Sequence, residues 1–299
     1  YLYHHHQATQ SIGERVFDEV TSTVAVRYFD ASYHGVAWQA VAERYRPLVV
    51  NAPTTAARYT ALRSMLAQLH DNHTAVYSPA DLEPPRNRDP HAVFGMAPDA
   101  TVSEPAVDWK TLRPGVGYLR LSSFPDSVHS VLGWAMAGIG HERALILDLR
   151  GNPGGLVDSV DEVAGMFLPR GTLISVGTRR YNLFGSQRFT ATDNAGFTYP
   201  GRLVVLIDKN SRSGAESLAR ALQYYHRATL VGTRSAGKVL GVDAEMTLAD
   251  GGLLRVATLD MHAPDGQRLE GQGVRPDLSV SDETRQIPKA LALLDEPIR

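Results

Sequence analysis

Ser213 and Lys238 are the two residues of this sequence whose types and spacing best suit nucleophilic catalysis. Ser213 lies between an apolar run at 203–207 and a stretch with helical spacing, and Lys238 follows a second apolar run at 228–231. A serine hydroxyl is a weak nucleophile unless a base takes its proton, and a lysine with a neutral amine can be that base. A helix N-terminus also offers free N–H groups to a developing oxyanion. The pair therefore indicates a site for nucleophilic catalysis.

The pattern around Ser213 also fits a purely structural role. Glu216 lies three residues later, and Ser-x-x-Glu is the pattern of a capping box, whose side chains satisfy the first N–H groups of a helix. Both roles are compatible if Ser211 or Asn210 caps the helix instead. The local pattern alone leaves the role of Ser213 open.

Alternating strands and helices from residue 115 onward would position these residues. Four strands and two helices are expected there, at 116–121, 144–149, 203–207, 228–231, 127–139 and 157–168. This rhythm predicts an α/β fold of βαβ-type units, with a core sheet covered by helices. Two further strands, at 172–178 and 187–192, are expected to form a hairpin.

The rest of the chain is predicted to fall into two parts. Apolar residues recur at helical spacing through residues 10–70, which predicts an N-terminal helical subdomain over 1–79. Proline and charged residues then dominate 80–114, which is expected to be a linker. The α/β core would occupy 115–299.

Composition narrows the function classes. Hydrophobic residues make up 43% and charged residues 21%, which is ordinary for a globular protein. The formal net charge is −2, so we expect no nucleic-acid partner. The sequence has no cysteine, which excludes disulfides and thiolate metal sites, and no apolar run is long enough to predict a membrane-spanning segment.

The stretch around Ser213 resembles the active-site region of the C-terminal processing peptidases, also called tail-specific proteases. In that family a serine precedes a glutamate by three residues, and a lysine follows a glycine about one helix and one strand later. Ser213, Glu216, Gly237 and Lys238 fall on these positions. The combination of several motifs in the same order makes the resemblance specific.

The likeness extends beyond the serine and lysine motifs. Residues 147–155 resemble the family's strand and glycine turn, and residues 269–277 resemble a segment near its C-terminus. The resemblance covers roughly 115–280 and implies a crotonase-like spiral of ββα units. A phosphate-binding interpretation of the glycines is weak, because the turn matches neither a P-loop nor a dinucleotide fingerprint.

The resemblance implies a serine endopeptidase that acts through an acyl-enzyme, without a metal or an organic cofactor. Ser213 would be the nucleophile, Lys238 the general base, and Glu216 an orienter of Lys238 or of the helix start. The oxyanion hole would use the N–H groups of Gly154 and Gly214, although the glycines also suit a tight turn. The expected partner is a peptide or protein substrate.

The sequence departs from the family pattern in several places. Many members carry a PDZ domain before the catalytic core, but no PDZ domain is evident here, since the linker at 80–114 is too short to hold one. Tail-specific recognition is therefore in doubt. Val239 replaces a glycine that is common after the lysine, and Tyr224 replaces an aspartate found in some members.

A second catalytic arrangement is possible, because the chain shares features with tricorn-type relatives. The helical part ends in a Leu-x-Asp-x-His-Thr-like run that contains His73, and those relatives use a histidine there as the base. Glu270 lies where they place a catalytic glutamate. Structural roles are the alternative for both: His73 would tie the helices to the next domain, and Glu270 would be an ordinary loop carboxylate.

Two other functions stay open at this point. One is a non-catalytic peptide- or lipid-binding module, as in retinoid-binding relatives with the same fold. The other is a hydrolase or acyl-transfer enzyme of specialised metabolism. Family analogy alone favours an exported or periplasmic location, and the sequence does not indicate an oligomeric state.

Overall fold

The computed structural model describes residues 10–82, 106–126, 128–180, 186–192, 198–242 and 245–296. Its internal contacts divide the chain into two compact units, which we describe separately. The smaller unit comprises Tyr1–Pro90, Thr178–Gly185 and Leu240–Asp260. The larger unit comprises His91–Gly177, Ser186–Val239 and Met261–Arg299.

Helices make up most of the smaller unit. These are α2 (Ile12–Arg27), η1 (Tyr33–Gly35), α3 (Trp38–Val50), α4 (Thr55–Leu66), η2 (Ala67–Leu69) and α5 (Pro79–Leu82). Ser11 and Glu14 form a capping box at the start of α2, and Thr54 accepts a hydrogen bond from Ala57 N–H at the start of α4. The apolar faces of the helices meet in a core that includes Val20 of α2 and Leu62 of α4. The predicted helical character of 10–70 is confirmed.

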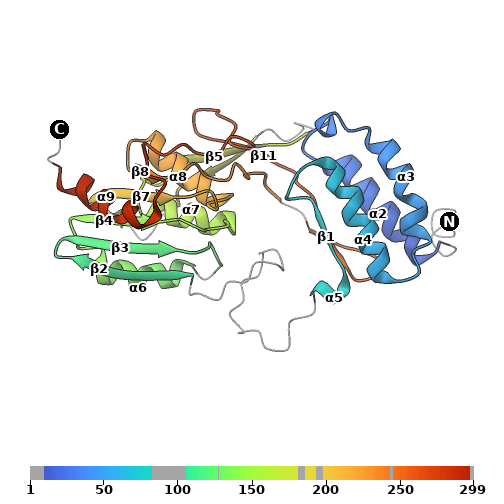
Figure 1. The fold of residues 1–299 in the computed structure, drawn as a ribbon, viewed down its shortest axis with the longest axis horizontal. Coiled ribbons are helices and arrows are strands. Elements are labelled where there is room, and N and C mark those ends of the chain that lie inside the picture. The colour runs from blue at the N-terminus through green and yellow to red at the C-terminus, as the bar shows by residue number, and fades with distance from the viewer. Residues whose placement is uncertain are drawn as a thin grey trace. The chain divides into compact units, whose positions relative to one another are not determined.

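A small antiparallel sheet completes the smaller unit. Its order is β1 (Ala75–Tyr77), β10 (Leu253–Arg255) and β9 (Glu245–Thr247). Val76 pairs with Leu254, so two segments far apart in the sequence share one sheet (Figure 1). The sequence analysis had assigned 240–260 to the α/β core.

A six-stranded sheet forms the centre of the larger unit. Its order is β12 (Leu278–Ser279), β8 (Thr229–Gly232), β7 (Arg202–Ile207), β4 (Ala144–Asp148), β3 (Val116–Leu121) and β2 (Val107–Arg113). All neighbours are parallel except the antiparallel pair β2 and β3. Every strand expected at 116–121, 144–149, 203–207 and 228–231 is present, because these apolar runs are buried in the sheet.

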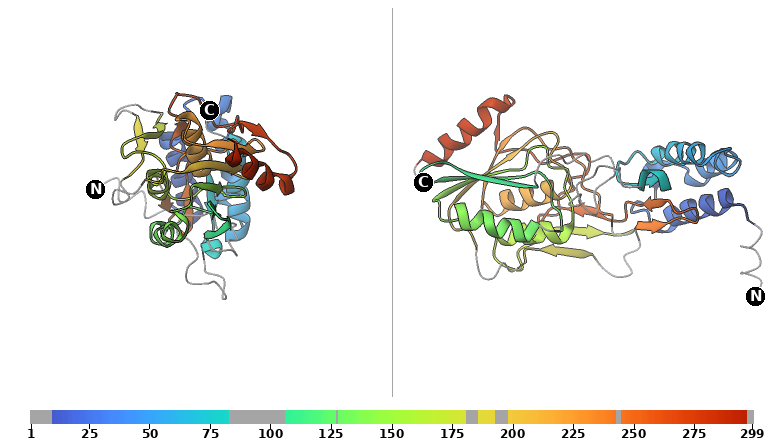
Figure 2. Two further views of the ribbon diagram at one scale, coloured as in Figure 1. Left: turned by 90° about the vertical axis from the view of Figure 1, so that its left-hand side faces the viewer. Right: turned by 90° about the horizontal axis from the view of Figure 1, so that it is seen from below.

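Helices cover both faces of this sheet. The crossover helices are α6 (Val128–Ile139), α7 (Val157–Gly165) and α8 (Gly214–Tyr224), and α9 (Glu283–Asp295) follows β12. Alternate residues such as Tyr118 and Ile146 face Ala290 and Leu294 of α9. Figure 2 shows α9 on the opposite face from α6 and α7. Successive crossovers proceed in one direction along the sheet, which places their helices on one face.

The remaining strands form a separate three-stranded sheet. β5 (Leu173–Thr178) pairs with β6 (Gln187–Thr190) in an antiparallel arrangement, which confirms the predicted hairpin. β11 (Asp260–His262) lies on the other side of β5. Within the described ranges, none of the helices combines the length and apolar character needed to cross a bilayer.

Two predicted boundaries differ from the structure. The expected linker at 80–114 ends early, because 107–113 pairs with β3 as an edge strand. The helix expected over 157–168 ends at Gly165, since Met166 N–H turns back to Val163. Residues 83–105, where the question of a PDZ domain arises, lie outside the described residues.

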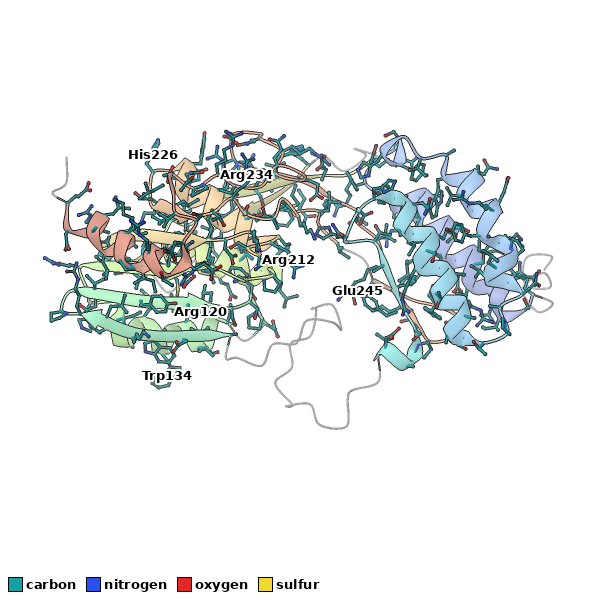
Figure 3. All side chains as sticks on the ribbon, in the orientation of Figure 1. Arg120, Trp134, Arg212, His226, Arg234 and Glu245 are labelled. Atoms are coloured by element: carbon teal, nitrogen blue, oxygen red, sulfur yellow. The ribbon has the colours of Figure 1, made fainter. Side chains whose placement is uncertain are left out.

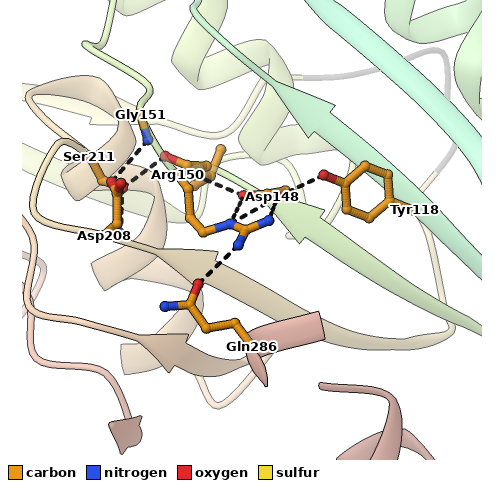
Figure 4. A network of polar contacts seen from close by, with 8 residues as sticks. Tyr118, Asp148, Arg150, Gly151, Asp208, Ser211 and Gln286 are labelled. Carbon is orange, nitrogen blue, oxygen red and sulfur yellow. Dashed lines mark hydrogen bonds and ion pairs between the residues drawn. The ribbon is translucent and has the colours of Figure 1, made fainter. Parts of the chain in front are cut away.

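A buried polar network fixes the carboxyl end of β4 to α9. Arg150 donates two hydrogen bonds through Nε to the Asp148 carboxylate, at 2.8 and 3.0 Å, and one through a terminal nitrogen to Gln286 at 3.1 Å (Figure 4). Tyr118 donates to Asp148 at 2.7 Å, and burial together with that carboxylate raises the pKa of Tyr118 to about 12. The network holds in place the turn that follows β4.

Candidate active site

Three loops meet at the carboxyl ends of the neighbouring strands β4, β7 and β8. We call them the glycine turn (149–155), the nucleophile loop (208–213) and the lysine loop (233–239). Because the three strands are parallel and adjacent, their loops emerge at the same edge of the sheet. The sheet thus brings together segments that are widely separated in the sequence.

Ser213 has a strained backbone conformation at the start of α8. Its φ of 53° and ψ of −120° lie in a region that residues with a side chain rarely adopt. Such a conformation costs about 1–3 kcal/mol and persists only where surrounding contacts hold it. The prediction that Ser213 lies at a helix N-terminus is confirmed, and the conformation places its side chain at a sharp strand-to-helix turn.

Main-chain contacts join Ser213 to Lys238. The Ser213 N–H donates to the Lys238 carbonyl oxygen at 2.8 Å. The same N–H also lies 3.2 Å from Oε2 of Glu216, which is the arrangement of one half of a capping box. The lysine loop is therefore held directly against the nucleophile loop, and Lys238 itself is half-buried.

The Glu216 carboxylate connects the lysine loop to the start of α8. Its side chain is fully buried and accepts hydrogen bonds from four donors: Ser235 Oγ at 2.5 Å, Gly237 N at 2.7 Å, Lys238 N at 2.9 Å and Ser213 N at 3.2 Å. Burial raises the pKa of the Glu216 carboxyl, and the four donors oppose that shift. One carboxylate thus sets the lysine loop against the start of α8.

The glycine turn touches the nucleophile directly. A Cβ placed on Gly154, whose φ is +96°, would lie 2.7 Å from Cβ of Ser213. A Cβ on Gly214 would lie 2.5 Å from Cγ2 of Val160, a residue of α7. Glycine at 154 therefore lets the turn approach the nucleophile loop closely, and glycine at 214 leaves room for the Val160 side chain.

Asn152 determines where the N–H groups of the glycine turn point. The fully buried Asn152 side chain accepts a hydrogen bond from Gly154 N at 2.8 Å and donates one to Leu121 O at 2.9 Å. The main-chain carbonyl oxygen of Asn152 accepts a hydrogen bond from the N–H of Arg212 at 2.8 Å. Among the described residues, the N–H groups of Gly155 and Gly214 have no protein acceptor. The N–H of Gly154, by contrast, is already engaged.

The two residues of the alternative arrangement belong to different units. Glu270 lies in the larger unit, where its Oε2 accepts the N–H of Val239 at 2.6 Å, next to Lys238. His73 lies in the smaller unit. Asp71 Oδ1 accepts the N–H groups of His73 at 2.7 Å and of Thr74 at 2.6 Å. Ser213, Glu216 and Lys238 are joined by hydrogen bonds within the larger unit.

The sequence analysis did not single out Asn152 or Ser235 as site residues. Asn152 precedes a proline and reads as a turn residue. Ser235 is buried, and its hydroxyl accepts Val274 N–H at 2.6 Å while it donates to Glu216. Only their position inside motifs that match the family could have indicated these roles.

The smaller unit contains a separate groove of about 1000 Å³ between α2 and residues 31–43. Trp38 and Tyr33 line it together with small side chains such as Ala25. None of the sequence-predicted site residues lines this groove, and we do not assign it to the active site.

The sequence matches two known families. Residues 115–280, more than half of the chain, match the family described as Peptidase family S41. Residues 14–67 match the family described as Tricorn protease C1 domain. The two matches together cover most of the helical part and the α/β part.

Curated relatives support the first match. A carboxy-terminal-processing protease of Bartonella bacilliformis is 36% identical over 171 residues, which cover 55% of this chain and 38% of the relative. A carboxyl-terminal-processing protease of Synechocystis sp. is 36% identical over 170 residues, with the same two coverages. The chain therefore spans well under half the length of these curated relatives.

Solved structures share the fold. A photosystem II D1 C-terminal processing protease superposes with a TM-score of 0.70 at 22% identity, covering 92% of this chain and 94% of that one. The tricorn protease gives a TM-score of 0.60 at 16% identity, covering 96% of this chain and 37% of that one. At such identities these likenesses show an α/β fold shared with peptidases. Together with the match over residues 115–280, they lead to the conclusion that the chain belongs to peptidase family S41.

Proposed function

We propose that this chain is a serine peptidase that hydrolyses peptide bonds through an acyl-enzyme on Ser213, with Lys238 as the general base. The observation that carries the proposal is the 2.8 Å hydrogen bond from Ser213 N–H to the Lys238 carbonyl, made at a strained strand-to-helix turn. It sets the two residues side by side. Membership of peptidase family S41 and the names of the curated relatives support the reaction class.

The proposed reaction has two halves. The neutral Lys238 amine takes the Ser213 hydroxyl proton as Oγ bonds to the substrate carbonyl carbon, and the lysine returns that proton to the leaving amine as the C–N bond breaks. The amine of Lys238 then takes a proton from a water molecule that attacks the ester. The ester bond breaks, the acid is released and Oγ regains a proton.

The oxyanion would be held by backbone N–H groups around Ser213. Gly214 supplies one of them, because its N–H has no acceptor among the described residues and follows the nucleophile directly. Gly154 is the other donor that the family resemblance implies, and it lies against Ser213. The N–H of Gly154 must break its hydrogen bond to Asn152 Oδ1 before it can donate to the oxyanion. The N–H of Gly155 has no such bond to break.

We further infer that the larger unit is a crotonase-like spiral. Strands β3, β4, β7 and β8 follow one another in the sheet in the order of the sequence. A crossover helix lies between each pair, as a spiral of repeated units requires. The proposed catalytic residues would then lie on the loops that follow three consecutive strands of the spiral, β4, β7 and β8.

Covalent labelling provides the direct test of the nucleophile. A fluorophosphonate probe should modify Ser213 in the wild-type chain, and Ser213→Ala should abolish both labelling and cleavage of a peptide library. Ser211→Ala is the matched control for labelling, because Ser211 lies on the same loop but its buried hydroxyl donates to Leu149 O at 2.8 Å. Peptide cleavage at the wild-type rate by Ser213→Ala would reject the proposal.

Substitution of the two candidate bases separates the two catalytic arrangements. We expect Lys238→Ala to lower the rate by about 10²–10⁴, the scale of a positioned acid–base group. Lys238→Arg should not restore it, because a guanidinium stays protonated. His73→Gln should keep most of the activity. If instead His73→Gln and Glu270→Gln are folded but inactive while Lys238→Ala is active, histidine is the base.

A further inference from the structure

Two carboxylates at the nucleophile and lysine loops, those of Asp208 and Glu216, are buried and accept hydrogen bonds from the protein itself. Asp208 is 7% exposed, and its Oδ1 accepts hydrogen bonds from Gly151 N and Asn210 N. Glu216 is fully buried with four donors. Both carboxylates are buried, and their oxygens accept hydrogen bonds from internal donors.

The exposed charges of the same two loops are all positive. Lys209 and Arg212 are exposed on the nucleophile loop, and Arg234 is exposed on the lysine loop. The chain as a whole carries a net charge of −2, so this concentration of cations is a local feature. Exposed carboxylates of the larger unit outside these loops include Asp126, which precedes α6, and Asp158, in the first turn of α7. The exposed charged side chains of these two loops are therefore cationic, while the half-buried Glu270 contacts the lysine loop through the N–H of Val239.

Arg212 is the cation closest to the nucleophile along the chain. Its main chain is fixed on both sides: its N–H donates to Asn152 O at 2.8 Å, and its carbonyl accepts Ala215 N–H at 3.0 Å. Its guanidinium has no ion-pair or hydrogen-bond partner among the described residues. Figure 3 shows Arg212 at the edge of the larger unit. By contrast, Arg234 already donates to Gln272 O at 2.9 Å.

The geometry limits which part of a substrate Arg212 can reach. Adjacent Cα atoms are about 3.8 Å apart, and an extended peptide advances about 3.3 Å per residue. A long side chain one residue from the nucleophile therefore reaches substrate groups one or two residues from the cleaved bond. A guanidinium binds carboxylates through paired, charge-assisted hydrogen bonds.

We propose that Arg212 binds a substrate carboxylate next to the cleaved bond and so makes acidic peptides the preferred substrates. This inference rests on the proposed peptidase function and adds a substrate class to it. The carboxylate comes either from an Asp or Glu side chain or from the free C-terminus of a short peptide. Both present the same chemistry to the guanidinium.

Matched peptides test the proposal by turnover. We would compare peptides that differ only by Asp or Asn at each position flanking the cleaved bond, and peptides that end in a free carboxylate or an amide. We expect the wild-type chain to favour the acidic member in kcat/KM by about 10- to 100-fold, the scale of a charge-assisted hydrogen bond. Arg212→Gln should bring that ratio close to one. Lys209→Gln, which removes an exposed cation of the same loop, should leave the ratio unchanged.

A binding assay keeps the proposal testable without turnover. The same fluorescent peptides would be titrated into Ser213→Ala and into the Ser213→Ala, Arg212→Gln double variant. Tighter binding of acidic peptides that is lost in the double variant supports the carboxylate site, and the responding peptide pair identifies its source. Equal affinity for acidic and neutral peptides overturns it. Absence of labelling at Ser213 would instead refute the peptidase proposal, whatever the binding result.

Discussion

Two buried carboxylates of the larger unit show how differently the protein uses the same group. Glu216 at the start of α8 is fully buried and receives four donors. Asp161 in α7 is 9% exposed, and its Oδ1 has no hydrogen-bond partner among the described residues. Burial raises the pKa of both, to about 7 for Asp161, where a backbone hydrogen bond from Thr190 opposes the shift and the charge of Asp158 adds to it.

The difference lies in the donors, because both groups are buried. A carboxylate that satisfies several N–H groups becomes a structural anchor, and here the anchored segments carry the candidate nucleophile and base. A carboxylate with fewer donors, as Asp161 has with the backbone N–H of Thr190, is less stabilised in its charged form, and burial then leaves its pKa raised. We therefore expect substitution of Glu216 to disrupt the site, and substitution of Asp161 to change mainly the pH dependence of stability.

The largest effect is expected from Glu216→Gln. The glutamine amide has one oxygen that can accept hydrogen bonds, whereas both carboxylate oxygens of Glu216 accept them. The NH₂ group of the amide would therefore face N–H groups that have lost their acceptor. We expect the free energy of unfolding to fall by about 2–4 kcal/mol, and activity to fall by about 10²-fold because the lysine loop shifts. Urea denaturation and peptide turnover measure the two effects.

The exposed Glu43→Gln on α3 is the control for that variant, and its stability should stay within about 0.5 kcal/mol of the wild type. A Glu216→Gln chain with wild-type stability and activity would contradict the anchoring role.

A smaller, pH-dependent effect is expected from Asp161→Asn. The folded pKa of about 7 lies above the ordinary value near 4, so between these values the folded chain holds a proton that the unfolded chain has released. This group's contribution to stability is therefore full below about pH 4 and is lost as the pH rises through 7.

Asparagine mimics the protonated acid and cannot titrate. Asp161→Asn should lie closest to the wild type at pH 4.5 and be more stable at pH 8 by about 1–3 kcal/mol. Melting temperatures measured from pH 4.5 to 8 give the comparison. A constant difference between variant and wild type across this range would show that Asp161 does not titrate there.

The smallest effect is expected from the strained backbone of Ser213, three residues before Glu216. Ser213→Ala and Ser213→Gly both remove the hydroxyl, but only glycine adopts the positive φ without strain. The glycine variant should be about 1 kcal/mol more stable than the alanine variant. Calorimetry of the two variants tests this, and equal stabilities would mean that the backbone relaxes in Ser213→Ala.

The sequence predicted the four central strands of the larger unit's sheet, for a physical reason. Runs such as 203–207 are apolar and β-branched because parallel strands are buried on both faces, and this signal is local. The helix that starts after Ser213 was predictable from its spacing in the same way. Family motifs added which side chains to consider.

Other features depended on contacts that local patterns do not encode. The positive φ of Ser213 has no sequence signal, because non-glycine residues seldom adopt it. The pairing of Val76 with Leu254 joins segments far apart in the chain. The engagement of Gly154 N–H by Asn152 likewise required the folded turn. The catalytic roles of Ser213, Lys238 and Glu216 stay predictions.

The segment 240–260 has a consequence for how the chain can be divided. Leu240, Leu248, Leu254, Val256 and Ala257 belong to the core of the smaller unit, although they follow the lysine loop. The strand β10 lies between β1 and β9, so a fragment that begins at residue 106 would lack its β1 partner. Such a fragment should expose these apolar side chains and elute as aggregates on size exclusion, whereas a soluble monomer would show that the segment refolds elsewhere. The helical part is thus not a detachable module, and the peptidase part should not be obtainable by simple truncation.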